Sequence, residues 1–346
     1  MTRAAAGVLV LLAVSTACSA SPTRPGGEPP RTPDLERKPA LKLGELHDLV
    51  PAAGLRFLVE GSPRKIWDNP RLRAAFGELL PDAKLDGFTE RTGVDLRKLE
   101  SALVAGFDMG TLYLGQCADS CGPRARSLFI ERLSGRELVT QTDTEPVAAN
   151  VRGTLDGEPF GFVDMGRVVG VASRDLTLAR IPIAYALGKL KKTPPALGGA
   201  ALSTLPELAR DRLVTFYAPG PFEGEWTQGL HGLLSAALSV ALYVEPVDDE
   251  YLRFTVVISG DFSAGGQAAL DELTRVFGEV AASSTGKLFA FERARSIRGS
   301  FNPQYLTLSA ELPLSPLVSG LRAAVIADVW EILGLPKPDS ASGRPE

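Results

Sequence analysis

Apolar residues recur along the chain with two spacings, one typical of helices and one typical of strands. Spacing of three and four residues predicts amphipathic helices. Asn69 and Asp95 stand where N-caps are expected, with Pro70 in the first turn after Asn69, whereas Pro182 should kink or split the helix that contains it. The predicted helices cover 71–80, 92–106, 175–190, 223–242, 265–281 and 315–333.

Stretches rich in β-branched and aromatic residues, bounded by turn formers, predict strands between these helices. Asp156-Gly157 suits the tight turn of a hairpin inside a meander over 151–173. The other predicted strands cover 106–115, 126–133, 136–141, 213–219, 251–262, 287–301 and 304–312. Hairpins and meanders with helices between them favour an α+β fold with largely antiparallel sheets covered by helices.

The folded part divides at a stretch rich in proline and glycine. Residues 191–200 read KKTPPALGGA, which is typical of a junction. We therefore expect two α+β lobes, over 45–192 and 198–336, followed by a disordered tail over 337–346. No fixed short period is visible, so a solenoid or a propeller is not expected.

The first residues have the features of an export signal. A basic start at Met1–Arg3 precedes an apolar run from Ala4 to Val14 and the small residues Ser15–Ala17. Eleven apolar residues are too few for a membrane-spanning helix, which needs about 20. The segment after Cys18, up to about residue 44, is rich in proline and polar residues and cannot form a core.

Small residues directly before Cys18, with a flexible segment after it, resemble the lipobox of bacterial lipoproteins. The resemblance implies that residues 1–17 are removed and that Cys18 carries diacylglycerol, with a further fatty acid such as palmitate on its amino group. Ser15 departs from the leucine that is usual at this place. An ordinary secretory leader cut near Ala17 or Ala20 is the alternative. Ser19 after the cysteine would permit an outer-membrane location by the enterobacterial sorting convention.

Three cysteines occur in the chain, and lipidation of Cys18 would leave Cys117 and Cys121 as a pair. Turn formers surround this pair, so we expect a disulfide at the tip of a hairpin between 106–115 and 126–133. A metal clip and a redox pair are the alternatives. Metal sites recruit four ligands, and His47 and His231 lie far away in sequence, with His47 expected to be exposed at the end of the tether.

Composition and motifs narrow the range of functions. A net charge of −4 without a basic cluster argues against nucleic acid as a partner. The sequence contains no esterase elbow, phosphate-binding loop, zinc-protease helix or dinucleotide fingerprint, so it indicates neither a cofactor nor a metal.

Two weak patterns supply candidate site residues. Asp108 and Asp164 both precede Met-Gly, so they could form a carboxylate pair. Two strands of similar structure would give the same Asp-Met-Gly pattern without any shared site. His231 lies four residues before Ser235 on the predicted helix, at the spacing of a base and a nucleophile. No acid on that helix face would orient the imidazole, which favours a polar surface.

The sequence thus favours a lipid-anchored cell-envelope protein that binds another envelope component without catalysis. A carrier of an apolar ligand, with helices 174–190 and 224–242 lining a groove, is one alternative. A carboxylate-dependent hydrolase of cell-wall glycans is another, and it would show two acids about 5 to 9 Å apart in a cleft.

Overall fold

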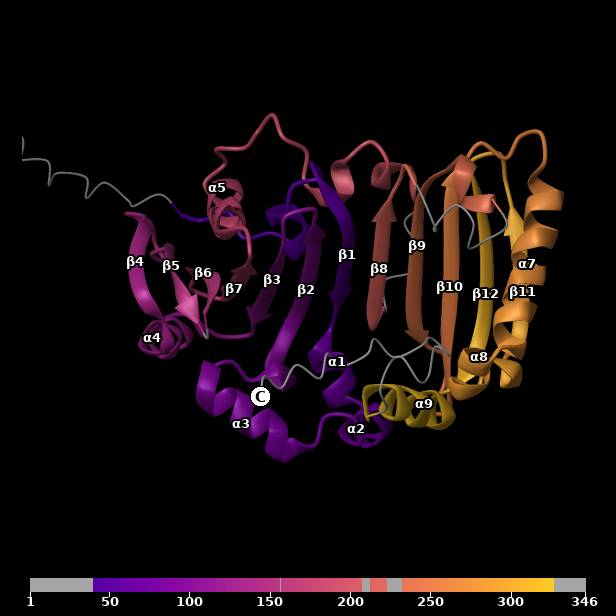
Figure 1. Cartoon of the computed structure of the whole chain (residues 1–346), viewed down its shortest axis with the longest axis horizontal. Helices are drawn as coiled ribbons and strands as arrows, with labels where there is room; N and C mark the ends of the chain where they lie inside the picture. The colour runs from indigo at the N-terminus through magenta and orange to yellow at the C-terminus, as the bar shows by residue number, and fades with distance from the viewer. Residues whose placement is uncertain (1–39, 156, 207–211, 223–231, 327–346) are drawn as a thin grey trace, which may run out of the picture. The chain divides into compact units, whose positions relative to one another are not determined.

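A computed structural model describes residues 40–155, 157–206, 212–222 and 232–326. The fold is α+β, as expected, and its strands form a single antiparallel sheet of twelve strands in the order β4-β5-β6-β7-β3-β2-β1-β8-β9-β10-β12-β11 (Figure 1). Of the predicted regions, the leader, Cys18, most of the tether and the tail lie outside the described residues. No helix in the described part is both long and apolar enough to cross a membrane.

The strands of the two predicted lobes meet within this sheet. β1 pairs with β8, with Leu58 opposite Tyr217 and Glu60 opposite Thr215. All strands before residue 191 lie on one side of this join and all later strands on the other. The strands are β1 (Leu55–Gly61), β2 (Leu99–Phe107), β3 (Gly110–Cys117), β4 (Ser134–Gln141), β5 (Ala149–Leu155), β6 (Glu158–Met165), β7 (Val168–Ser173), β8 (Val214–Pro219), β9 (Ala237–Pro246), β10 (Tyr251–Gly260), β11 (Arg295–Phe301) and β12 (Tyr305–Pro313).

Several helix signals are confirmed. The Asn69 side chain accepts hydrogen bonds from the backbone N–H groups of Arg71 and Leu72, and Asp95 caps a short 3₁₀ turn. Pro182 lies in the first turn of α5, directly after a separate 3₁₀ turn, so the predicted split is present. The described helices are α1 (Pro63–Asp68), α2 (Pro70–Gly77), α3 (Asp82–Thr92), α4 (Gly122–Arg132), α5 (Ile181–Ala186), α7 (Gly266–Ala282), α8 (Ser284–Leu288) and α9 (Leu314–Ile326).

The predicted helix 92–106 is wrong in its larger part, and the predicted helix 223–242 is wrong from Ala237 onward. Beyond the turn at Asp95, residues 99–107 form β2, which pairs with β1 on one side and β3 on the other. The side chains of Leu103 and Ala105 are buried in the core. Of the predicted helix 223–242, residues 223–231 lie outside the described part and the strand β9 begins at Ala237. In both segments small and aliphatic residues fit either periodicity, and pairing with neighbouring strands determines the outcome.

One predicted strand is instead a helix. Residues 126–133 belong mainly to α4, which begins with Pro123 in its first turn and packs Ala125 and Phe129 against Phe162 of β6. The Cys117–Cys121 disulfide is confirmed, with 6.2 Å between the two Cα atoms. It joins the end of β3 to the start of α4 rather than stapling the tip of a hairpin. The predicted strand 287–301 is likewise shorter, because α8 and a 3₁₀ turn precede β11.

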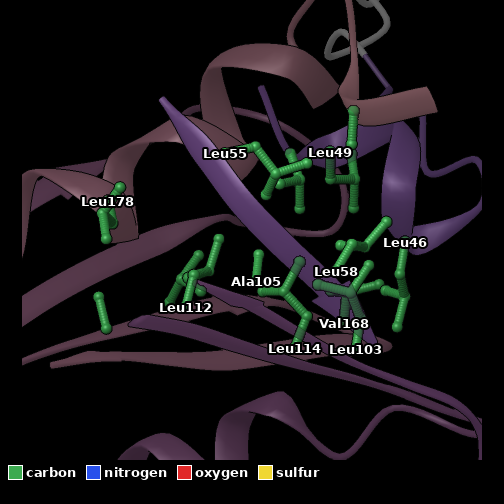
Figure 2. Packing of buried hydrophobic residues seen from close by; sticks show 14 of the residues in the cluster. Leu46, Leu49, Leu55, Leu58, Leu103, Ala105, Leu112, Leu114, Val168 and Leu178 are labelled. Carbon is green, nitrogen blue, oxygen red and sulfur yellow. The ribbon is translucent and has the colours of Figure 1, made fainter. Parts of the chain in front are cut away.

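Different segments cover the two faces of the sheet. On one face, a 3₁₀ turn at Leu46–Leu49 and the segment 176–205 pack on the central strands; Figure 2 shows Leu46 and Leu49 beside Leu58 of β1 and other buried leucines. On the opposite face, α4 packs on β6 and β7, and α7 packs Leu273 against β10 and β12. The first face carries the candidate site, beside the segment 176–205.

Candidate binding groove

A hollow of about 1110 Å³ lies on the first face of the sheet, slightly larger than the typical ligand pocket of about 300–1,000 Å³. We call it the central groove. Its floor is formed by polar and aromatic side chains of neighbouring strands, and one wall is formed by the segment that follows α5. The floor includes Glu60 of β1, Ser101 of β2, Gln116 of β3, Thr215 and Tyr217 of β8 and Tyr243 of β9; the wall includes Leu197, Leu202, Leu205 and Pro206.

A histidine and a carboxylate pair at one side of the central groove. Buried Leu46 and Leu49 anchor the 3₁₀ turn that carries His47, and β1 places Glu60 so that His47 Nδ1 lies 3.0 Å from Glu60 Oε2. Burial disfavours the charged imidazole, but the hydrogen bond with Glu60 and the nearby carboxylates outweigh it and raise the pKa of His47 above 6.5. His47 is only 22% exposed, so the expectation of an exposed residue is wrong.

An arginine and two tyrosines form the centre of the floor. Arg212 Nη1 donates to Tyr217 Oη at 3.2 Å, and its guanidinium carbon lies 4.3 Å from the centre of the Tyr243 ring. The two rings meet edge to face at 5.9 Å. Burial raises the pKa of both tyrosines, so their hydroxyls are neutral at physiological pH and serve as hydrogen-bonding groups.

A chain of hydroxyls holds the wall of the groove on the sheet. Thr204 Oγ1 donates to Ser259 Oγ at 3.0 Å, and Ser259 Oγ lies 2.5 Å from Ser239 Oγ. Both serines are fully buried in the sheet, on β10 and β9. Thr204 lies between Leu202 and Leu205, so this chain fixes the position of the apolar wall relative to the polar floor.

A second hollow, of about 260 Å³, adjoins Tyr243 on β9–β12; we call it the distal hollow. Glu311 of β12 accepts from Arg253 at 3.0 Å and from Arg295 at 2.9 Å, and these bonds lower its pKa. Arg295 also contacts Asp248 at 2.8 Å. The lining is Tyr243, Glu245, Arg253, Thr255, Ser296, Arg298, Thr307, Ser309 and Glu311.

The structure does not bring Asp108 and Asp164 together. Asp108 lies in the turn between β2 and β3 and pairs with Arg56 on the surface. Asp164 is buried on β6, where it accepts from the Gly166 N–H at 2.8 Å. Asp164 lies opposite Val169 of β7, and Val169 lies opposite Gly115 of β3. Gly115 is five residues along β3 from the turn that contains Asp108, which separates the two aspartates by about 17 Å along the strand direction at about 3.4 Å for each residue. Neither aspartate lines either hollow.

The environment of Asp164 is structural. Burial raises the pKa of its carboxyl, although the Gly166 N–H and Arg126, 3.6 Å away, act in the opposite direction. His231 lies outside the described residues, and Ser235 Oγ donates to the carbonyl oxygen of Gly232. Among the described residues, no group of three or more His, Cys, Asp or Glu side chains is arranged to hold a metal ion.

The groove residues themselves were missed by sequence reasoning. Alternation on β8 and β9 does place Thr215, Tyr217 and Tyr243 on one face of the sheet, and this signal is visible in the sequence. It does not reveal that the segment after α5 folds back over this face. Glu60 gives no local signal, because its partner His47 meets it only through the packing of the 3₁₀ turn.

Comparisons with known proteins give distant similarities. No family model matches the chain. An alignment of 209 positions, which covers 53% of this chain, gives 29% identity to the polyketide synthase GfsA of Streptomyces halstedii and covers 3% of that protein. The crystal form III structure of TP0453 superposes with a TM-score of 0.47 at 10% identity, covering 82% of this chain and 99% of that one. Crystal form I of TP0453 gives 0.46 at 9% identity, covering 82% and 98%.

Proposed function

We propose that this protein is a lipid-anchored cell-envelope protein that binds a cell-wall glycan in the central groove and does not cleave it. The observation that carries the proposal is the combination of a polar floor with an apolar wall in one hollow. The anchor is supported by the leader and by Cys18, whose sequence context resembles a lipobox.

The two surfaces of the groove match the two surfaces of a sugar ring. Ring edges carry hydroxyl and amide groups, for which Ser101, Gln116 and Thr215 offer donors and acceptors. Ring faces carry C–H groups, which pack well on aliphatic side chains such as those of Leu202 and Leu205. A purely apolar ligand would displace water from the remaining donors and acceptors of the floor without replacing its hydrogen bonds, at a cost of about 1–3 kcal/mol for each group left unpaired. The groove therefore favours a glycan over an apolar ligand.

Two of the carboxylates that line the groove are already paired, which favours binding over catalysis. Glu60 pairs with His47, and Glu100 pairs with Arg167 at 2.7 Å. Within the described part of the chain, neither ring nitrogen of His47 makes a hydrogen bond to a hydroxyl, as a base that activates a serine would. Free carboxylates on both sides of a glycosidic bond would be the mark of a hydrolase.

Titration of the exported chain with chitohexaose, followed by calorimetry, tests the glycan proposal. We expect saturable binding that Gln116→Ala weakens about fivefold or more, because the floor loses a donor and an acceptor. Gln267→Ala removes the same side chain from the surface of α7 and should leave the affinity unchanged. Failure of both chitohexaose and a peptide-free cell-wall strand to bind would refute the proposal, and release of shorter sugars in the mass spectrum would establish hydrolysis instead.

The anchor is tested separately, by the intact mass of protein extracted from its native membrane. We expect the mass of the chain from Cys18 with added acyl chains. A Cys18→Ala variant should lose those chains and leave the membrane fraction. A native mass without lipid would refute the anchor and would leave the glycan proposal standing.

A further inference from the structure

One row of paired residues crosses six strands on the face that carries both hollows. Glu60 of β1 lies opposite Thr215 of β8, which lies opposite Tyr243 of β9. The row continues through Thr255 of β10 and Ser309 of β12 to Arg298 of β11. We call this row the cross-strand track. Five strand spacings of about 4.8 Å give it a length of about 24 Å.

The cross-strand track connects the two hollows. Glu60 and Thr215 lie in the central groove, Tyr243 lines both hollows, and Ser309 and Arg298 line the distal hollow. Register partners on neighbouring strands point to the same face of a sheet, so all of these side chains lie on one surface. An extended ligand in the central groove can therefore continue over Tyr243 to the edge strand β11.

Charge is distributed unevenly along this surface. In the adjacent row Glu311 is held between Arg253 and Arg295, and Arg295 also pairs with Asp248, so the two positive and two negative charges offset one another. Arg298 is exposed and forms no ion pair with any residue that the structure describes; its row neighbours, Ser309 and Thr255, are neutral. Glu245 also faces the distal hollow and sets a negative charge beside it. Arg298 thus ends the track with a guanidinium that is available to an anion.

We infer that the ligand is an acidic glycan that lies across the strands and places a carboxylate on Arg298. This inference rests on the proposed function and specifies its ligand. A guanidinium offers two parallel N–H donors to one carboxylate, and hydroxyls such as that of Ser309 can hold the sugar that carries the acid. The glycan strand of the bacterial cell wall has this chemistry where it carries no peptide, because the lactyl group of N-acetylmuramic acid, every second sugar, then ends in a free carboxylate.

The experiment compares two ligands that share one backbone. Chitohexaose is the neutral probe, and the acidic probe is a peptide-free strand of alternating N-acetylglucosamine and N-acetylmuramic acid of the same length. We expect the acidic strand to bind about tenfold more tightly at low salt, with the advantage shrinking as salt rises. Arg298→Gln should remove this advantage and leave chitohexaose binding within about twofold.

A matched variant and separate outcomes make the test decisive. Arg124→Gln removes an exposed arginine from α4 and should preserve the advantage of the acidic strand; thermal melts check that both variants fold. Equal affinity for the two probes would overturn the acidic ligand but leave the proposed function intact. Loss of both affinities in Arg298→Gln would also overturn it, since Arg298 would then not select the acid. Binding of neither probe would overturn both proposals.

Discussion

At the scale of single residues, His47 joins the covering segment to the sheet. Its carbonyl oxygen accepts from the Val50 N–H within the 3₁₀ turn, while its imidazole reaches Glu60 of β1. The same side chain therefore borders the groove and holds the turn that forms its rim. This arrangement makes the stability of the rim depend on pH.

We predict that His47→Gln destabilises the protein more at pH 5.5 than at pH 8.5. Because the pKa of His47 in the folded state lies above its value of about 6.5 in the unfolded chain, the stabilisation is fully present below pH 6.5. It is lost as pH rises through the folded-state pKa. Urea unfolding should show a loss of about 1 kcal/mol at the lower pH and a smaller loss at the higher pH. Equal losses of stability at both pH values would contradict a charged His47–Glu60 pair.

Residues whose partners are close in sequence were predictable. Asn69 caps a helix through N–H groups two and three residues away, and Cys117 and Cys121 are four residues apart. His47 and Glu60 are 13 residues apart and meet only after the turn and β1 have packed. The same distinction separates the confirmed caps and disulfide from the missed groove.

At the scale of elements, α4 is held at its first turn by a close approach and by the disulfide. A Cβ at Gly122 would lie 1.8 Å from Asp164 Oδ1 and 2.9 Å from the carbonyl oxygen of Gly166. Glycine therefore lets the start of α4 lie directly on the turn between β6 and β7. The Gly122 N–H donates to the Gly166 carbonyl oxygen at 2.8 Å and fixes this contact.

We predict that Gly122→Ala costs about 1–3 kcal/mol, because the added methyl group forces Asp164 or the backbone to move. Gly278→Ala is the matched control. It lies within α7 with no heavy atom within 4 Å of the added Cβ, and it should stabilise the protein by about 0.5–1 kcal/mol. Denaturant midpoints measure both changes. If both substitutions changed the free energy of unfolding in the same direction, the close approach at Gly122 would be contradicted.

Removal of the disulfide should have a moderate effect. Chain-entropy reasoning for so small a ring gives about 2 kcal/mol. We predict this loss for the Cys117→Ser, Cys121→Ser double variant, measured by urea unfolding against the oxidised parent. Reductant should destabilise the parent by a similar amount and leave the double variant unchanged. If reductant left the stability of the parent unchanged, the disulfide would make no contribution to stability.

Elements were predictable where one periodicity excluded the other. α7 has a clear helical stripe, and β10 and β12 alternate in a way that no helix does. The wrong assignments, at 99–106, 126–132 and 237–242, are segments in which small and aliphatic residues satisfy both patterns. In these segments tertiary contacts, such as the packing of Phe129 on Phe162, determine whether a helix or a strand forms.

At the scale of the whole molecule, one sheet runs through both halves of the chain. The α+β class followed from hairpins and meanders, which are local. The β1–β8 pairing joins strands that are far apart in sequence, and no local pattern specifies it. The groove and the cross-strand track depend on this join, which explains why neither was visible before the structure.

We predict that Leu58→Ala weakens both halves together. Leu58 is fully buried on β1 at the join, and its truncation should cost about 2–5 kcal/mol. Hydrogen exchange should show faster global opening for amides in β6 and in β10 alike. Leu238→Ala, at an exposed position, should change stability by less than about 0.5 kcal/mol. Acceleration in β6 alone would indicate that the halves unfold independently.

The proposed lipid anchor would hold many copies on one membrane, and the outer strands of the sheet determine whether such copies would associate. In the described part of the chain β4 and β11 are the outer strands, and the pairing of each with its neighbour is interrupted by bulges. Bulges and charged side chains such as those of Arg136 and Arg298 prevent another chain from adding a strand. Confinement to a surface raises local concentration, the condition under which regular edges template aggregation. Irregular edges should keep crowded copies of this protein separate, each with its own groove accessible.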